Sequence, residues 1–150
     1  MARSAPDVPV PETHLLIRRY YDAFNGRRFS ENAELFTPDA VIHHRPNSGR
    51  RQGPGGYLES AREAMASWPD LHLRILHVEQ RGDTIVEIDV SATGTLVGDW
   101  TAGDFGTLKA TGQLRTFRIR ETLEIRGGKI TFSGLTYDLQ ELLGKPGSLR

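Results

Sequence analysis

The 150-residue sequence contains no cysteine. This absence excludes disulfide bonds, thiolate metal sites and a cysteine nucleophile. Neither sign of charge is in excess, because 19 Lys and Arg residues balance 19 Asp and Glu residues. We therefore expect no broad basic face and no nucleic-acid partner. Apolar runs are also short, far below the ~20 residues of a membrane span, so no membrane partner is expected.

The two ends of the sequence differ from its middle. Residues 1–12 include three prolines and no apolar segment of the kind found in signal peptides, and they are predicted to form a flexible arm. Residues 13–144 suit a single globular domain, and residues 145–150 are predicted to be a tail. Without a targeting signal, the expected location is cytoplasmic.

The first half of the domain has helical periodicity. Leu16, Tyr20 and Phe24 recur at i, i+4 and i+8, which is the spacing of one helix face. Two further helices are predicted, a short one over "ENAELF" and a longer one over "YLESAREAMASW". A proline follows each of them closely and predicts where it ends.

After Pro69 the period of the apolar residues changes from 3.6 to 2, which predicts strands. The predicted strands are "LHLRILHV", "TIVEIDVSA", "LRTFRIRETLEI" and "ITFSGLTYD". Helices followed by strands predict an α+β domain in which three helices cover one face of an antiparallel sheet.

The turn "RGGK" allows the register of the last two strands to be predicted. If its two glycines form a two-residue loop, directly opposed residues share one face of the sheet. The predicted inward residues are Phe117, Ile119, Glu121, Leu123 and Ile125, opposite Asp138, Thr136, Gly134, Phe132 and Ile130. The apolar face then carries two carboxylates, provided that no bulge interrupts the pair.

The opposite face of this hairpin carries Leu135 and Tyr137 among polar residues. Such a mixed surface suits a partner, and we expect a homodimer that packs sheet to sheet. The same alternation in the preceding hairpin predicts that His77 points inward with Leu71, Leu73 and Ile75.

A buried carboxylate is costly unless it is paired or protonated, and burial raises its pKa. Such a group can exchange protons near neutral pH, as a general acid or base must. Glu121 and Asp138 are therefore candidate acid/base residues. Two structural alternatives remain open: Asp138 caps the final helix, or Glu121 pairs with an arginine such as Arg115.

The histidines do not predict a metal site. No pair among the five has a recognised ligand spacing, and no glycine pattern typical of a nucleotide site is present. His43 and His44 are adjacent, so in an extended segment they point to opposite sides. The candidates to line an aromatic-binding cavity are Tyr20, Tyr21, Phe24, Trp68 and Trp100, with ordinary core packing as the alternative for the first three.

Several stretches together resemble the SnoaL-like polyketide cyclases, which have the nuclear-transport-factor-2-like fold. These are "IRRYYDAFNGRRFSENAELFTPDAVIHHRP", "WPDLHLRI", "SATGT", "GGKI" and "YDLQELLG". The resemblance implies a cone-shaped α+β barrel, with three N-terminal helices over a curved sheet that encloses an apolar pocket. It also implies frequent homodimers.

The resemblance further implies an enzyme that tailors aromatic polyketides without a metal or cofactor. In these cyclases an aspartate late in the last strand is the general acid/base of an intramolecular aldol condensation, and Asp138 matches it. His44 matches the histidine of the family's "HDP"-like segment. The predicted substrate-binding residues are Tyr20, Phe24, Trp68, His77, Phe117, Glu121 and Thr136. Polyketide hydroxylation, epoxide opening and ligand carriage without chemistry are alternatives on the same scaffold.

Overall fold

The structure, a computed structural model, describes residues 9–44, 50–101 and 107–142. The first part of the chain forms α1 (Pro11–Asn25), α2 (Phe29–Ala33), β1 (Phe36–His44), β2 (Arg51–Gln52) and α3 (Gly53–Ser67). The second part forms β3 (His72–Gln80), β4 (Ile85–Thr95), β5 (Trp100–Thr101), β6 (Thr107–Leu108), β7 (Leu114–Arg126), β8 (Lys129–Tyr137) and α4 (Leu139–Leu142). The predicted domain of residues 13–144 thus holds nearly all of these elements, whereas most of the arm and all of the tail lie outside the described residues.

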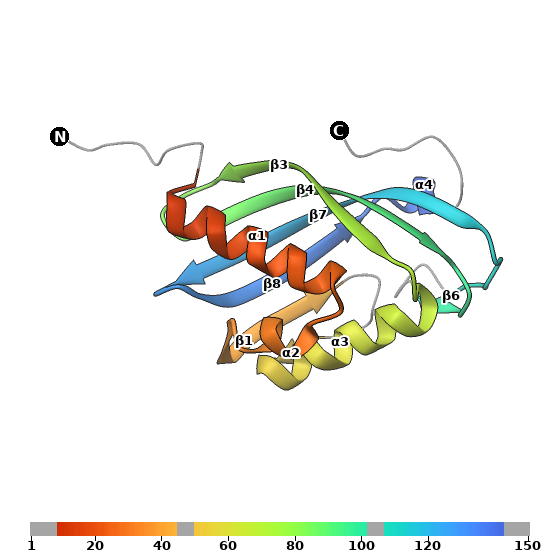
Figure 1. The fold of residues 1–150 in the computed structure, drawn as a ribbon, viewed down its shortest axis with the longest axis horizontal. Helices are drawn as coiled ribbons and strands as arrows, with labels where there is room; N and C mark the ends of the chain where they lie inside the picture. Colours follow the sequence, from red (N-terminus) through yellow and green to blue (C-terminus); the bar gives the residue numbers. More distant parts are fainter. Residues whose placement is uncertain (1–8, 45–49, 102–106, 143–150) are drawn as a thin grey trace.

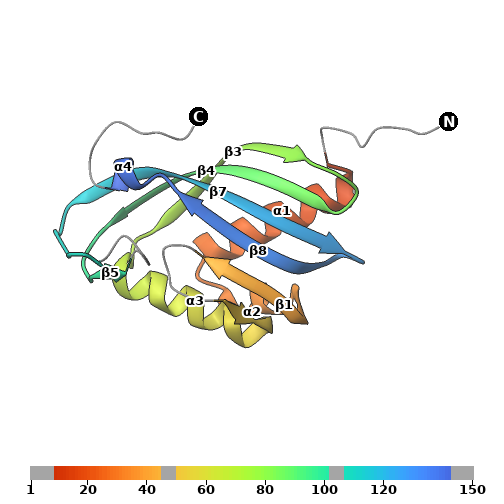
Figure 2. The ribbon, with the colours of Figure 1, turned by 180° about the vertical axis from the view of Figure 1, so that it is seen from behind.

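The main sheet has six strands in the order β2-β1-β8-β7-β4-β3. It is curved, and α1, α2 and α3 lie on one side of it (Figures 1 and 2). The prediction of three helices over one curved sheet is therefore confirmed. The sheet is open rather than closed, and it is mixed rather than antiparallel because β1 runs parallel to β8. No hairpin turn joins these two strands, so their relative direction was not set by a local sequence signal.

The first helix begins at Pro11 and ends before Gly26. Proline suits the first helical position, because its missing N–H would have no partner there and its fixed φ is already helical. Residues 11 and 12 consequently belong to this helix rather than to the predicted arm. The buried face of the helix includes Ile17, Tyr20 and Tyr21.

The longest strand pair of the sheet is β4 and β7. Their register is continuous from Ile85 opposite Glu124 to Thr95 opposite Leu114. The inward residues are Val86, Ile88, Val90 and Ala92 from β4, and Phe117, Ile119, Glu121 and Leu123 from β7. The predicted inward face of β7 is confirmed, and Glu121 lies opposite Ile88 on this buried face.

A β-bulge changes the register of β8. Ile125 pairs with Ile130 as predicted, but Glu124 then pairs with Phe132, so Thr131 is an extra residue in the strand. Because side chains alternate, one extra residue exchanges the two faces of the strand beyond it. Thr136 is consequently exposed on the outer face, and its predicted inward position is wrong.

The same bulge explains the position of Asp138, which follows β8 and is 1% exposed. Its backbone N–H donates to the carbonyl of Arg118, and its Oδ1 accepts a hydrogen bond from the backbone N–H of Glu141 at 3.1 Å. An aspartate that accepts from the third helical residue is an N-cap. The helix-capping interpretation of Asp138 is therefore confirmed by the geometry.

A second bulge lies in β3, between Ile75 and His77. Beyond it Val78 pairs with Ile88, and His77 is exposed. The predicted inward position of His77 is wrong for the same physical reason as that of Thr136. In both hairpins the alternation was correct up to one inserted residue and reversed after it.

The bulge in β8 also bears on the predicted homodimer. Leu135 and Tyr137 were expected on the outer face, and both line the pocket under the helices instead. The surface argument for sheet-to-sheet packing therefore loses these two residues, and the homodimer stays a prediction.

The register of β8 predicts that two neighbouring substitutions change the stability of the protein by very different amounts. Leu135→Asp should lower the free energy of unfolding by at least ~2 kcal/mol, because it places an unpaired carboxylate against the core. Thr136→Asp, on the exposed face, should change it by less than ~0.5 kcal/mol. Urea unfolding followed by circular dichroism measures both, and the reverse order of effects would contradict the bulged register.

Candidate functional site

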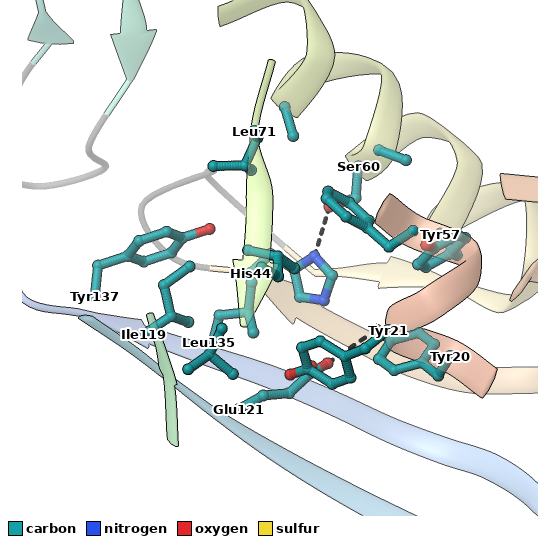
Figure 3. A pocket seen from close by; sticks show the side chains of 15 residues that line it. Tyr20, Tyr21, His44, Tyr57, Ser60, Leu71, Ile119, Glu121, Leu135 and Tyr137 are labelled. Carbon is teal, nitrogen blue, oxygen red and sulfur yellow. Dashed lines mark hydrogen bonds between the residues drawn. The ribbon is translucent and has the colours of Figure 1, made fainter. Parts of the chain in front are cut away.

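An open pocket lies between the helices and the inner face of the sheet (Figure 3). Its space is about 600 Å³ when the open mouth and the solvent space in front of it are counted. The lining residues are Tyr20, Tyr21, Phe24, His44, Tyr57, Ser60, Ala61, Ala64, Leu71, Leu73, Val90, Ile119, Glu121, Leu135 and Tyr137. Most of this wall is aliphatic or aromatic, so its few polar groups decide how a ligand is oriented.

The carboxylate of Glu121 receives three hydrogen bonds from hydroxyl groups. Oε2 accepts from the Tyr20 hydroxyl at 2.9 Å and from the Ser133 hydroxyl at 2.6 Å, and Oε1 accepts from the Tyr21 hydroxyl at 2.5 Å. Glu121 itself is 3% exposed. Within the described part of the chain no salt bridge involves Glu121, so the predicted ion pair with Arg115 is wrong, and neutral donors hold the carboxylate instead.

Burial raises the pKa of the Glu121 carboxyl above its usual value, and the hydrogen bonds from Ser133, Tyr21 and Tyr20 oppose this rise. Burial also raises the pKa of Tyr20 and Tyr21 well above the usual value, and the charge of Glu121 adds to this effect. Both phenols therefore stay protonated as donors. The outcome is a carboxyl group that is more easily protonated than a glutamate in water.

His44, the last residue of β1, is joined to this carboxylate through Ser133. Its Nδ1 is 2.6 Å from Oγ of Ser60 on α3, and its Nε2 is 2.9 Å from Oγ of Ser133 on β8. Burial, with smaller contributions from the nearby charges of Arg51 and His43, lowers the pKa of His44 to about 3. The imidazole is therefore neutral at physiological pH, with one ring nitrogen as a donor and the other as an acceptor.

The position of the first helix is fixed by aromatic packing and by one asparagine. The Tyr20 ring packs edge-on against Tyr21 and Phe36, with centroid distances of 5.4 and 6.0 Å. The side-chain nitrogen of Asn32 donates to the carbonyl of Tyr20 and to the hydroxyl of Tyr57. These contacts hold the hydroxyl groups of Tyr20 and Tyr21 over Glu121.

Tyr137 supplies a polar group at another part of the wall. Its ring stacks on Phe117 at 6.2 Å and meets the edge of Trp100 at 6.2 Å. Burial raises its pKa, so the phenol remains protonated. Figure 3 shows the hydroxyl pointing into the pocket, and among the described residues none forms a hydrogen bond with it. This hydroxyl is available to a ligand.

The structure brings together four of the predicted site residues and separates the other five. Tyr20, Phe24, His44 and Glu121 line the pocket. Trp68 and Phe117 are buried and pack against each other at 5.1 Å, outside the pocket lining. His77 and Thr136 are exposed, and Asp138 caps α4.

Sequence analysis named Tyr20 and Tyr21 as cavity candidates, and both line the pocket, but it missed the other hydroxyl groups of the site. Tyr57, Ser60 and Tyr137 also line the pocket, and Ser133 connects His44 to Glu121. The adjacent Tyr20 and Tyr21 carried a signal, because a buried pair of phenols requires polar partners. Ser60 and Ser133 carried no such signal, because their role depends on contacts with His44, which is 16 positions away from Ser60 and 89 positions away from Ser133 in the sequence.

Residues 9–44, 50–101 and 107–142 contain no cluster of three or more histidine or carboxylate side chains that could hold a metal ion. The helices in these ranges are all too short or too polar to cross a lipid bilayer.

The sequence and fold are similar to those of known proteins. IdmH, a candidate polyketide cyclase from Streptomyces antibioticus, is 24% identical over 90% of this chain and 97% of its own, with a TM-score of 0.72. AclR, a candidate hydroxylase from Streptomyces galilaeus, is 18% identical over 91% and 96%, with a TM-score of 0.71. A candidate SnoaL-like polyketide cyclase from Jannaschia sp. CCS1 is 16% identical over 100% and 99%, with a TM-score of 0.74. At these identities the likeness shows a common fold.

The sequence matches no curated protein. A family model described as a SnoaL-like domain, however, matches residues 17–133. Since this match extends over more than half of the chain, the protein belongs to the SnoaL-like domain family.

Proposed function

We propose that the protein is a tailoring enzyme that transfers protons on a small, largely apolar molecule of the aromatic polyketide class, with Glu121 as general acid/base. The observation that carries this proposal is a carboxyl group with a raised pKa on the wall of an apolar pocket. A group of this kind is suited to proton transfer near neutral pH. The fold is shared with candidate polyketide cyclases, which supports the substrate class.

The finer proposal is an intramolecular aldol cyclisation carried out by side chains alone. The carboxylate of Glu121 takes a proton from the carbon next to a carbonyl, and the C–H electron pair remains on the substrate as an enolate. The enolate carbon attacks a second carbonyl of the same molecule, so a C–C bond forms and an alkoxide is left. The alkoxide then takes the proton back, and no proton or electron is gained or lost overall.

Glu121 replaces Asp138 as the proposed acid/base residue. The carboxylate of Asp138 accepts a helix N–H and lies outside the pocket lining, whereas Glu121 lines the pocket. His44 keeps its proposed role in the site, through the serine that joins it to Glu121.

A ligand carrier without chemistry is the second candidate. The observation in its favour is that both oxygens of Glu121 already accept hydrogen bonds from protein hydroxyls. A carboxylate in that state can serve as the anchor of a rigid polar network.

Substituting the two carboxylates separately tests the enzyme proposal. Glu121→Gln keeps the shape of the side chain but removes the proton acceptor, so turnover of a polycyclic polyketide substrate should fall by at least ~100-fold. Asp138→Asn keeps the capping oxygen and should retain turnover within about 3-fold, because asparagine and aspartate are similar N-caps. Steady-state kinetics on both variants measures the difference.

If Asp138→Asn lost activity while Glu121→Gln kept it, the assignment would revert to the aspartate. If both variants turned the substrate over at the wild-type rate, the carrier would be the better account. Circular dichroism of each variant checks that the fold is retained.

The raised pKa of Glu121 also predicts how stability depends on pH. A carboxyl that is more readily protonated in the folded state favours folding at low pH, and this contribution is lost as pH rises from about 4.3 through the folded-state pKa. Relative to Glu121→Gln, the free energy of unfolding of the wild type should therefore fall as pH increases over that window. Parallel urea titrations at several pH values measure the difference, and a constant or rising difference would contradict the raised pKa.

The available hydroxyl of Tyr137 predicts a preference among ligands. Fluorenone and fluorene differ in one carbonyl oxygen, and a neutral hydrogen bond of ~0.5–1.5 kcal/mol makes fluorenone bind roughly 2- to 12-fold more tightly. Tyr137→Phe should bind the two equally, with the affinity for fluorene unchanged, while the control Thr136→Ala on the outer face should keep the preference. Fluorescence titration measures the six affinities of the three proteins for the two compounds. A preference that survives in Tyr137→Phe, or failure of either compound to bind the wild type, would contradict this account of the pocket.

A further inference from the structure

A chain of hydrogen bonds links one side of the pocket to Glu121 through the protein interior. It runs from Ser60 on α3 to His44 on β1, from His44 to Ser133 on β8, and from Ser133 to Glu121 on β7, with heavy-atom distances of 2.6, 2.9 and 2.6 Å. Ser60, His44 and Glu121 line the pocket, whereas Ser133 is 0% exposed and lies behind its wall. Figure 3 shows the Ser60 end of this chain, where the hydroxyl meets the imidazole.

The direction of each hydrogen bond follows from the one between Ser133 and Glu121. The hydroxyl of Ser133 donates to Glu121 Oε2, so the Ser133 oxygen is left to accept a hydrogen bond from Nε2–H of His44. A neutral imidazole carries one N–H, and Nδ1 is therefore an acceptor for the hydroxyl of Ser60. The hydroxyl proton of Ser60 thus points to Nδ1 of His44, and the Ser60 oxygen keeps a lone pair for a ligand.

We propose that Ser60, His44 and Ser133 form a proton relay that carries a proton from a pocket-bound carbon or oxygen acid to Glu121. The Ser60 oxygen accepts the ligand's proton while its own proton passes to Nδ1 of His44. Nε2 of His44 gives its proton to Ser133, and the former Ser133 proton passes to Oε2 of Glu121. The ligand keeps the electron pair of its broken bond as an anion, and Glu121 becomes a neutral acid.

In this relay the imidazole changes its tautomer and never becomes an imidazolium. It starts with the proton on Nε2 and finishes with the proton on Nδ1, and it is neutral in both states. Its low pKa of about 3 is therefore no obstacle to its part in the relay. The strength of the relay as a base is set by Glu121, whose pKa burial raises.

Several elements packed against the relay contribute titratable or charged groups. They are Tyr20 and Tyr21 from α1, Tyr57 from α3, Tyr137 from β8, and Arg51 and His43 beside His44. On β4 the residue opposite Glu121 is Ile88, which has no charge. Burial raises the pKa of all four phenols, so they do not titrate near neutral pH. His43 is the neighbour that a control variant must remove.

The relay deepens the proposed acid/base function and rests on it, but its geometry is testable without a substrate. The probe is the proton itself, and the readout is the ¹⁵N chemical shift of the two ring nitrogens of His44 in the labelled full-length protein. The His44→Gln variant identifies these signals by their loss. As the pH is lowered from neutral and Glu121 takes up a proton, the N–H should move from Nε2 to Nδ1.

Three variants separate the relay from a general effect of pH. Ser133→Ala breaks the chain and should leave His44 in one tautomer over the whole titration. Ser91→Ala, which removes a serine from the outer face of β4, and His43→Gln should both keep the exchange. With an active substrate, Ser133→Ala should also lower kcat at least ~10-fold with little change in KM, because the serine does not line the pocket.

A single His44 tautomer throughout the wild-type titration would overturn the relay, and so would an exchange that persists in Ser133→Ala. Neither result bears on whether Glu121 acts directly on a ligand, which the turnover of Glu121→Gln decides. The failure of the relay and the failure of the proposed function are therefore distinguishable.

Discussion

The arrangement of the site depends on one constraint, which is a buried carboxylate that has no cation as partner among the described residues. Glu121 lies on β7 opposite Ile88 of β4, where its side chain is buried and lines the pocket. Three hydroxyl donors meet its oxygens, one from each of Tyr20, Tyr21 and Ser133. Because these donors come from α1 and β8, the polar network also fixes the distance between the helix and the sheet.

This constraint accounts for the neighbouring residues in turn. Asn32 holds the backbone of Tyr20 and the hydroxyl of Tyr57, so that the tyrosines keep their positions over the carboxylate. Ser133 donates its only hydroxyl proton to Glu121, so in its contact with His44 the serine oxygen is the acceptor and the imidazole is the donor. Burial among apolar side chains is the reason that the carboxyl is more readily protonated. The pocket and its polar network therefore form one unit, in which a ligand meets a carboxyl group prepared for proton transfer.

The fold was largely predictable from the sequence, because its main signals are local. Helical spacing located α1, period-2 alternation located β4 and β7, and the glycine turn paired Arg126 with Lys129. The alternation of β7 also placed Glu121 on the buried face. The parallel pairing of β1 with β8 had no such signal, since no turn connects the two strands.

The candidate site was predictable only in part, because bulges and long-range contacts decide the rest. Thr131 adds one residue to β8, which turns Tyr137 inward and Thr136 outward, and neither residue differs in type from those of a regular strand. The two serines at His44 are likewise ordinary in sequence, and only the packing of α3 and β8 makes them partners of the imidazole. The resemblance located Asp138 at the end of the last strand, but its carboxylate caps a helix in this chain.

The pKa of Glu121 in the folded protein tests the central claim most directly. A ¹³C NMR titration of the labelled glutamate carboxyls measures it, and the signal missing from Glu121→Gln identifies the residue. The account predicts a midpoint above the ordinary glutamate value of 4.5, with the wild-type fold intact across the transition. A midpoint at or below that value would contradict the account, because the carboxyl would then be an ordinary charged anchor rather than a group prepared for proton transfer.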